Sequence, residues 1–113
     1  MTFDVIIVGA GISGTYMSSL LKEKKKSVLV IEKSGGIGGR FSTKPIGSQI
    51  VDYGCQYIKP KTATSVHLAG KLENLGLLSK INLDVNKRVF VAPFGMNKIP
   101  QYLSRKTKVL SNT

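Results

Sequence analysis

The stretch VIIVGAGISG at residues 5–14 decides the fold of this chain. Its apolar run looks like a buried strand and leads directly into a glycine turn, after which residues 12–24 follow a helical pattern. A second apolar run, VLVI at residues 28–31, ends at Glu32. Strand, glycine turn, helix, strand and acid in this order predict a βαβ unit that binds the ADP half of a dinucleotide.

The three glycines of this turn have separate physical tasks. Gly9 permits the tight exit from the strand, and Gly14 lets the helix pack closely on the sheet. Gly11 lacks a side chain, so the backbone can approach a pyrophosphate. The pyrophosphate would then sit on the unsatisfied N–H groups of the helix that begins near Ile12. Glu32 lies at about the 20-residue spacing expected of the acid that binds the adenosine ribose.

A second glycine cluster follows Glu32 directly, in KSGGIGGR at residues 33–40. A nicotinamide dehydrogenase needs no such cluster after its ribose acid. Paired glycines permit another close approach of backbone and ligand, and Arg40 can bind a phosphate or form a structural ion pair. Further along, Gly54 in VDYGCQY at residues 51–57 permits a third approach.

The composition is that of one globular domain, with 113 residues, 42% hydrophobic residues and 12 glycines. No apolar run reaches the roughly 18 residues that span a membrane, and no basic leader precedes the first apolar run. We therefore expect neither a transmembrane segment nor a secretory signal. The single cysteine excludes an internal disulfide framework and favours a reducing compartment, so we expect a cytoplasmic protein.

The chain is strongly basic, with 17 Lys and Arg against six Asp and Glu and a formal net charge of +11. Such a charge favours solubility and loose attraction to polyanions. Four lysines, at positions 22 and 24–26, cluster where the first helix should end and where cations suit the helix dipole. The other cations are dispersed without interleaved aromatic residues, so we expect a solvated basic face and no dedicated nucleic-acid site.

The remaining pattern completes an α/β, Rossmann-like fold. In chain order we expect a strand at 3–8, a helix at 12–24, a strand from Ser27, a loop at 33–47, a strand at 48–53, a helix from Thr62 or Thr64 to Leu75, a strand at 87–92, a short helix at 97–103 and a strand at 107–110. Gly76 should stop the second of these helices. Apolar residues at helical spacing should face inward, namely Ile12, Tyr16, Met17, Leu20 and Leu21 in the first helix and Val66, Ala69 and Leu72 in the second.

Taken together, these motifs resemble the N-terminal part of the flavin-containing amine oxidase superfamily. The residues that carry the resemblance are Gly9 to Glu32, the Gly38-Gly39-Arg40 loop with Ser42-Thr43, Asp52 to Tyr57, and Phe90 to Asn97. Within the superfamily the likeness is greatest to renalase and the bacterial renalase-like NAD(P)/FAD oxidoreductases. The resemblance therefore implies the N-terminal part of a Rossmann-like FAD/NAD(P)-binding fold.

The resemblance also implies a cofactor, FAD, and the residues that hold it. In relatives FAD takes hydride from a reduced nicotinamide, NAD(P)H, or from an amine-like carbon, and O2 reoxidises it. The residues expected to bind the cofactor are Gly9, Gly11, Ile12, Ser13, Gly14, Glu32, Lys33, Gly39, Arg40, Gly54 and Gln56, of which the last two would lie near the flavin ring. The catalytic residues stay unknown, because the protein in this family mainly binds and orients the flavin.

In the family, an interleaved substrate domain and a C-terminal Gly-Asp segment complete the flavin site, and by this resemblance we expect neither within residues 1–113. We therefore expect residues 1–113 to form a single, incomplete FAD/NAD(P)-binding domain. Three alternatives stay open. The chain is the cofactor-binding part of an oxidoreductase for a small-molecule substrate, a non-catalytic dinucleotide module completed by a partner chain, or an inactive truncated remnant with an exposed sheet edge.

The other reactive residues have ordinary roles open to them. His67 lies inside an expected helix without a nearby acid or cysteine, which favours a surface or packing role. Cys55 replaces an alanine of the family and suits a small apolar filler better than a flavin contact. Asp52 can hold a loop by accepting backbone N–H bonds, and Tyr57 can pack in the core or face a substrate. No His/Cys cluster exists, so we expect no metal site.

Overall fold

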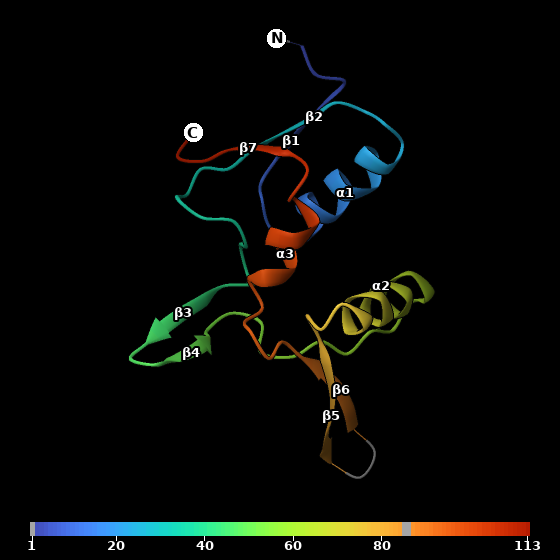
Figure 1. Ribbon diagram of the computed structural model, residues 1–113, viewed down its shortest axis with the longest axis vertical. Coiled ribbons are helices and arrows are strands. Elements are labelled where there is room, and N and C mark those ends of the chain that lie inside the picture. Colours follow the sequence, from blue (N-terminus) through green and yellow to red (C-terminus); the bar gives the residue numbers. More distant parts are fainter. Residues whose placement is uncertain (1, 85–86) are drawn as a thin grey trace.

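The computed structural model describes residues 2–84 and 87–113. Its elements follow in the order β1 (Val5–Val8), α1 (Ile12–Glu23), β2 (Val28–Ile31), β3 (Thr43–Ile46), β4 (Gln49–Asp52), α2 (Ala63–Asn74), β5 (Ser79–Asp84), β6 (Lys87–Val91), α3 (Lys98–Leu103) and β7 (Lys108–Leu110). Figure 1 shows β1, β2 and β7 beside α1 and α3 at one end of the molecule, with α2 and two hairpins toward the other.

Three parallel strands form the largest sheet, in the order β1-β2-β7. β1 pairs with β2 from Val5 opposite Val28 to Val8 opposite Ile31, and Val30 of β2 lies opposite Val109 of β7. Three of the four residues of β2 are buried, as a central parallel strand requires. Because α1 connects the parallel strands β1 and β2, the predicted βαβ unit is confirmed.

β1 is less buried than its apolar sequence suggests. Ile7 packs against Ala10 and Val30 in the core, whereas Ile6 is 57% and Val8 85% exposed. Within the described part of the chain, β1 pairs with β2 alone, and the alternating burial means that only one face of the strand is covered. The expectation of a strand buried throughout is therefore wrong for Ile6 and Val8.

α1 matches the predicted helix but buries a different stripe. Its fully buried residues are Thr15 and Ser18, whose small side chains let the helix lie close to its neighbours. Their hydroxyls donate to the carbonyls of Gly11 and Thr15 at 2.7 Å, so neither hydroxyl is left unpaired. Met17 is 50% exposed, contrary to expectation, because the helix turns it away from the face that holds Thr15 and Ser18. The other four residues of the expected stripe are half-buried.

α2 begins at a complete capping box, which confirms Thr62 as its cap. The Thr62 hydroxyl accepts from the Ser65 N–H at 3.1 Å, and the Ser65 hydroxyl accepts from the Thr62 N–H at 3.0 Å. After Leu75 the chain turns at Gly76, whose φ of +79° is a left-handed conformation that favours glycine. The predicted start and stop of this helix are both confirmed.

A second core cluster joins α2, α3 and the loop after β2, and it contains Phe41, Ala69, Leu72, Leu78, Ala92, Met96, Ile99 and Leu103. Val66 was expected to face inward but is 55% exposed, because α2 presents Leu68, Ala69 and Leu72 to the cluster. The helix at 97–103 and the strand at 107–110 are confirmed as α3 and β7. No helix in the described ranges combines the length and the apolar character that crossing a bilayer demands.

The two antiparallel hairpins were only partly predicted. β4 confirms the strand expected at 48–53, and β6 confirms the one at 87–92. Residues 43–46, expected in a loop, form β3 by pairing with β4, and the unpredicted β5 pairs with β6. All six residues of β5 are exposed, although Ile81 and Leu83 alternate with polar residues in the sequence. This short period-2 alternation is the strand signal that the prediction overlooked.

Candidate functional site

The glycine turn between β1 and α1 is shaped by its own backbone contacts. Gly9 has a φ of +103°, and its N–H donates to the carbonyl of Ile31 at 2.8 Å, which holds the end of β1 to β2. A Cβ added at Gly14 would overlap the carbonyl oxygen of Gly9 and lie 3.2 Å from a methyl carbon of Ile7. Gly9 and Gly14 are therefore required by the path of the chain itself.

Gly11 is different, because the protein leaves space at its α-carbon. A Cβ added there would meet nothing closer than 3.9 Å, the distance to the α-carbon of Gly39. Gly11 is also the N-cap of α1 and provides no capping side chain. The N–H groups of Ile12, Ser13 and Gly14 have no acceptor inside the helix by its geometry, and the first turn holds no acidic residue. This arrangement suits an anion at the positive end of α1.

Glu32 is held by hydrogen bonds that connect the two glycine segments. One carboxylate oxygen accepts the Ala10 N–H at 2.9 Å, and the other accepts the Ser34 N–H at 2.8 Å. These bonds, the Ala10 bond first, lower the pKa of Glu32 below its ordinary value, so the group is ionised at neutral pH. The backbone around it is also held, because the Glu32 N–H donates to the carbonyl of Leu110 in β7 at 2.8 Å. Glu32 thus has a structural role that the spacing alone did not predict.

The Gly38-Gly39 loop lies against the glycine turn through backbone alone. The Gly38 N–H donates to the carbonyl of Ala10 at 2.9 Å, and Gly38 forms an isolated parallel bridge with Gly11. Gly39 has a φ of +56°, and a Cβ there would lie 3.2 Å from the α-carbon of Gly11. The structure therefore brings together the two segments that the sequence marked separately.

The other expected site residues lie further along these loops. Arg40 is exposed, and its carbonyl accepts the Cys55 N–H at 2.8 Å. A Cβ at Gly54 would overlap that same carbonyl, so the close backbone approach at Gly54 is to Arg40. Lys33 and Gln56 are exposed loop residues.

A groove of about 460 Å³ continues from the Gly39 loop, and its lining residues are Ser34, Gly36, Ile37, Gly39, Ser42, Thr43, Tyr53, Asn97 and Gln101. Asn97 Oδ1 is buried in this wall and, among the described residues, has no hydrogen-bond partner. Asn97 and Gln101 were missed as site residues, because only the fold brings α3 and its N-cap to this loop. The signal available was the segment of residues 90–97, which the family resemblance included.

Asp52 organises the wall of this groove. One oxygen of its carboxylate accepts both the Thr43 hydroxyl at 2.7 Å and the Met96 N–H at 2.9 Å. The Thr43 hydroxyl in turn accepts the Asn97 N–H at 3.1 Å. The loop-stabilising role of Asp52 is therefore the one that the structure shows.

Cys55 is half-buried and packs against the second core cluster. Burial raises the pKa of its thiol, and the thiol donates to the carbonyl of Tyr57 at 3.1 Å. A protonated, packed thiol agrees with the interpretation of Cys55 as a filler. In the described part of the chain, no three His, Cys, Asp or Glu side chains gather as metal ligands.

A family model of NAD(P)-binding Rossmann-like domains matches residues 7–72. The matched span contains the glycine turn, Glu32 and the Gly38-Gly39 loop. The chain belongs to this family. The α/β, Rossmann-like fold expected from the sequence is thereby confirmed.

Several relatives of this Rossmann-like domain are flavin-containing amine oxidases. The chain is 42% identical to the flavin-containing amine oxidase of Oncorhynchus mykiss over 69 residues, which cover 60% of this chain and 13% of that protein. Flavin-containing amine oxidase A of Equus caballus is 33% identical over 88 residues, which cover 77% of this chain and 16% of that protein. Putrescine oxidase of Kocuria rosea is 29% identical over 92 residues, which cover 81% of this chain and 19% of that protein. The chain thus spans less than a fifth of the length of these relatives.

Solved structures agree with these relatives. Wild-type putrescine oxidase bound to putrescine matches with a TM-score of 0.58 and 34% identity, over 72% of this chain and 17% of that chain. Thermovibrio ammonificans THI4 matches with a TM-score of 0.63 over 96% of this chain and 38% of that one, but at 16% identity it supports the fold alone. The resemblance to the flavin-containing amine oxidase family is confirmed, whereas the narrower likeness to renalase stays a prediction.

Proposed function

We propose that residues 1–113 form a single domain that holds the ADP part of FAD at the N-terminus of α1. The observation that carries this proposal is the meeting of two glycine segments, Gly9 to Gly14 and Gly38-Gly39, beside the open first turn of a helix. The flavin-containing relatives support the choice of FAD among adenine dinucleotides.

Two features of the structure fit an extended dinucleotide. Gly11 has no side chain, and a Cβ there would already be in van der Waals contact with the α-carbon of Gly39 at 3.9 Å, so a glycine keeps the backbone beside the first turn of α1 accessible to a phosphate. Asn97 Oδ1 is a buried acceptor without a partner among the described residues, and a ligand hydroxyl would satisfy it. The groove that contains Asn97 begins at Gly39, beside the glycine turn.

Each residue then has a definite task. The N–H groups of Ile12 and Ser13 receive the pyrophosphate, and the exposed Arg40 adds positive charge. Glu32 accepts the ribose hydroxyls with the lone pairs that Ala10 and Ser34 leave free. Gly9 and Gly14 fix the path of the turn. Lys33, Gly54 and Gln56 are assigned as cofactor contacts on the family resemblance alone.

We further propose that the protein acts as a renalase-like flavin oxidoreductase. The chemistry that FAD would supply when bound is the acceptance of a hydride from a reduced nicotinamide or from an amine-like carbon of a small-molecule substrate. O2 would be the final electron acceptor. Because the chain spans less than a fifth of its relatives, we assign this reaction to a longer protein or to an assembly with a partner chain.

One observation favours a second candidate, a non-catalytic dinucleotide module. Val8 is 85% exposed immediately before the glycine turn, and Ile6 is 57% exposed on the same strand. A partner chain that covered this apolar face of β1 would complete the site, and these residues would then need no chemistry of their own.

The proposal is tested by the visible absorption spectrum of the purified chain after incubation with FAD and desalting. We expect a retained flavin band, and isothermal titration calorimetry should show that ADP alone also binds. If neither FAD nor ADP binds, the proposed site is wrong. Both candidate functions predict that this chain alone oxidises neither NAD(P)H nor an amine, so turnover by residues 1–113 alone would contradict the assignment of the reaction to a longer protein or an assembly.

A further inference from the structure

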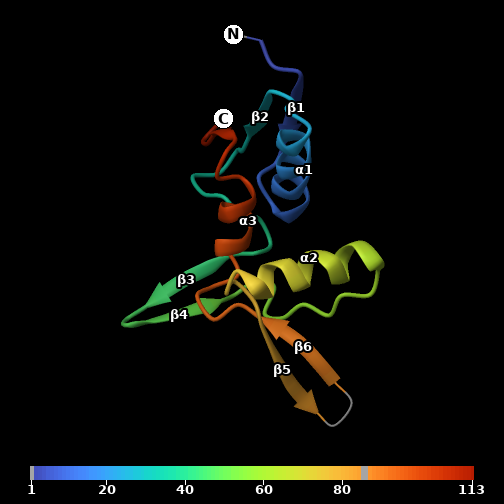
Figure 2. The same ribbon diagram turned by 45° about the vertical axis from the view of Figure 1, so that its right-hand side comes forward.

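A second cavity, of about 290 Å³, lies among α1, α2 and α3. Figure 2 shows α2 running below the lower ends of α1 and α3, and side chains of all three helices line the space. The cavity shares no lining residue with the groove beside Gly39. It is therefore a separate feature of the molecule, and its interpretation does not depend on the binding of FAD.

The inner wall of this cavity is apolar. Leu72 and Leu103 are buried members of the second core cluster, and Leu68 packs against the same cluster. Leu20 of α1 completes the apolar lining. Such a wall accepts the hydrocarbon or aromatic body of a ligand.

The rim of the cavity is strongly basic. It carries Lys22, Lys71, Arg105 and Lys106, against the single carboxylate of Glu23. Lys71 Nζ lies 3.8 Å from Glu23 Oε1, but the two side chains are 54% and 63% exposed, so water screens this pair. The rim therefore keeps a net positive charge that attracts an anion.

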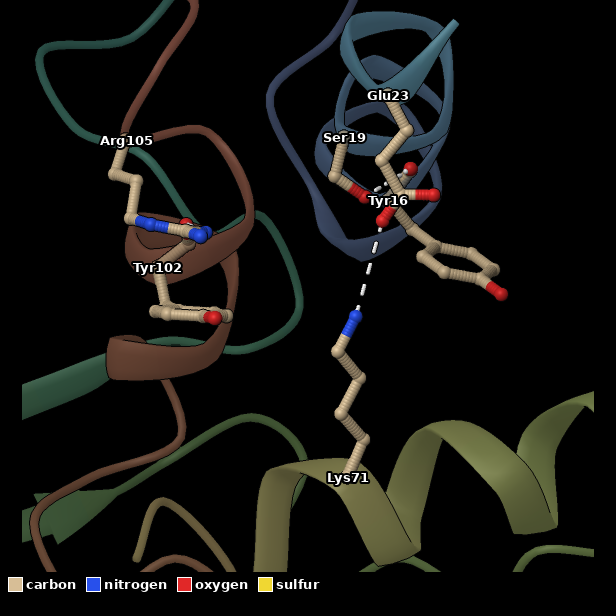
Figure 3. Close-up of polar contacts among 6 residues, drawn as sticks. All are labelled: Tyr16, Ser19, Glu23, Lys71, Tyr102 and Arg105. Carbon is tan, nitrogen blue, oxygen red and sulfur yellow. Dashed lines mark hydrogen bonds and ion pairs between the residues drawn. The ribbon is translucent and has the colours of Figure 1, made fainter. Parts of the chain in front are cut away.

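Arg105 is held in a defined position on this rim. Its guanidinium carbon lies 3.8 Å from the ring centroid of Tyr102, and its Nη1 donates to the carbonyl of Tyr102 at 2.9 Å. Figure 3 shows this stack on one side and the pair of Lys71 and Glu23 on the other. A guanidinium has five N–H donors, so Arg105 keeps donors for a ligand carboxylate.

Thr107 supplies an independent observation. Thr107 is one of the lining residues of the cavity, and its hydroxyl oxygen is buried and has no hydrogen-bond partner within the described ranges. A buried hydroxyl without a partner is rare in proteins and calls for one. An oxygen of a ligand that entered the cavity would accept its proton.

We propose that this cavity binds a small organic carboxylate with an apolar or aromatic body. The leucine wall takes the body, Arg105 and Lys71 pair with the carboxylate, and the Thr107 hydroxyl donates to it. The volume favours a small molecule, because it lies near the roughly 300 Å³ at which ligand pockets begin and is too small for a helix about 10 Å wide.

The test uses the ¹⁵N-labelled chain and naphthalene-2-carboxylate as the probe, followed by amide chemical shifts. We expect saturable shifts confined to amides of α1, α2 and the segment from α3 to Thr107. Arg105→Gln should weaken binding at least about tenfold, the loss of one charge-assisted hydrogen bond. Arg88→Gln makes the same charge change at an exposed residue of β6 that does not line the cavity, and it should leave the affinity unchanged.

Thr107→Val provides a second readout that separates binding from folding. Removing an unpartnered buried hydroxyl should keep or raise the melting temperature of the free chain while lowering its affinity for the probe. Non-saturating shifts spread over the basic surface would overturn the proposal. So would an affinity for the probe equal to that of the wild type in both the Arg105→Gln and the Thr107→Val variants. Displacement of the probe by ADP would overturn the separateness of the two sites, whereas failure of FAD to bind would leave this test unaffected.

Discussion

Gly11→Ser should stabilise the chain and weaken its binding of ADP, a combination that follows from the position of Gly11 as the N-cap of α1. The residue has φ −80° and ψ −168°, the extended conformation in which serine caps a helix well. A Cβ there would meet nothing closer than 3.9 Å, so the substitution introduces no clash inside the protein. The serine hydroxyl would accept an N–H bond from the first turn of α1, the same donors that we assign to the pyrophosphate.

The two effects have estimable sizes. The cap contributes a few tenths of a kcal/mol over glycine, and the lower entropy of the unfolded chain adds about 0.4–1 kcal/mol. A gain of about 1 kcal/mol raises the melting temperature of a domain of this size by about 4 °C. Loss of one charge-assisted bond to the pyrophosphate, about 1.5–3 kcal/mol, weakens ADP binding by about 10- to 150-fold.

Thermal unfolding followed by circular dichroism and calorimetric titration with ADP measure the two effects on the same sample. Gly70→Ser is the matched control, because Gly70 lies within α2 and a Cβ there would contact nothing within 4 Å. It should raise stability modestly through helix propensity and leave ADP binding unchanged. Unchanged ADP affinity in Gly11→Ser would refute the placement of the pyrophosphate, and a lower melting temperature would refute the capping argument.

Two further substitutions test the scaffold of the site. Gly14→Ala should lower the free energy of unfolding by about 1–3 kcal/mol in urea, because the methyl group overlaps the Gly9 carbonyl; a variant as stable as the wild type would contradict this. Glu32→Gln should be less stable than the wild type at pH 7, and the difference should shrink as the pH falls below the ordinary pKa of 4.5. The folded-state pKa of Glu32 is lowered, so its stabilisation is present above that value and is lost as the pH falls through the folded-state pKa. A difference that did not change with pH would show that the charge of Glu32 is not the cause.

Local signals were enough to predict the βαβ unit and both ends of α2. Glycine turns, apolar runs and the cap at Thr62 act over a few residues, so their meaning does not depend on the rest of the fold. β5 was missed although Ile81 and Leu83 alternate with polar residues, because the alternation is short and the strand is completed by its pairing with β6. The burial of Ile6 and Val8 was overestimated because an apolar run reports what a strand can bury and not whether a second layer covers it.

The candidate site shows the same division between local and non-local information. The sequence marked Gly11 and Gly39 separately, but the approach of the two glycines depends on the Gly38 N–H bond to Ala10. Likewise, Glu32 was expected to serve a ligand, whereas its hydrogen bonds to Ala10 and Ser34 also hold the two loops together.

The double role of Glu32 connects ligand binding to folding. A carboxylate oxygen has two lone pairs, so Glu32 can keep its bonds to Ala10 and Ser34 and still accept a ribose hydroxyl. The ligand would then bind a site that folding has already arranged, and little binding energy would be spent on ordering the loops. Linkage requires that such a ligand stabilise the chain, by about 2.7 kcal/mol at a free concentration of 100 times its dissociation constant. The same ligand should therefore protect the Ala10 and Ser34 amides together from hydrogen exchange, because one carboxylate holds both.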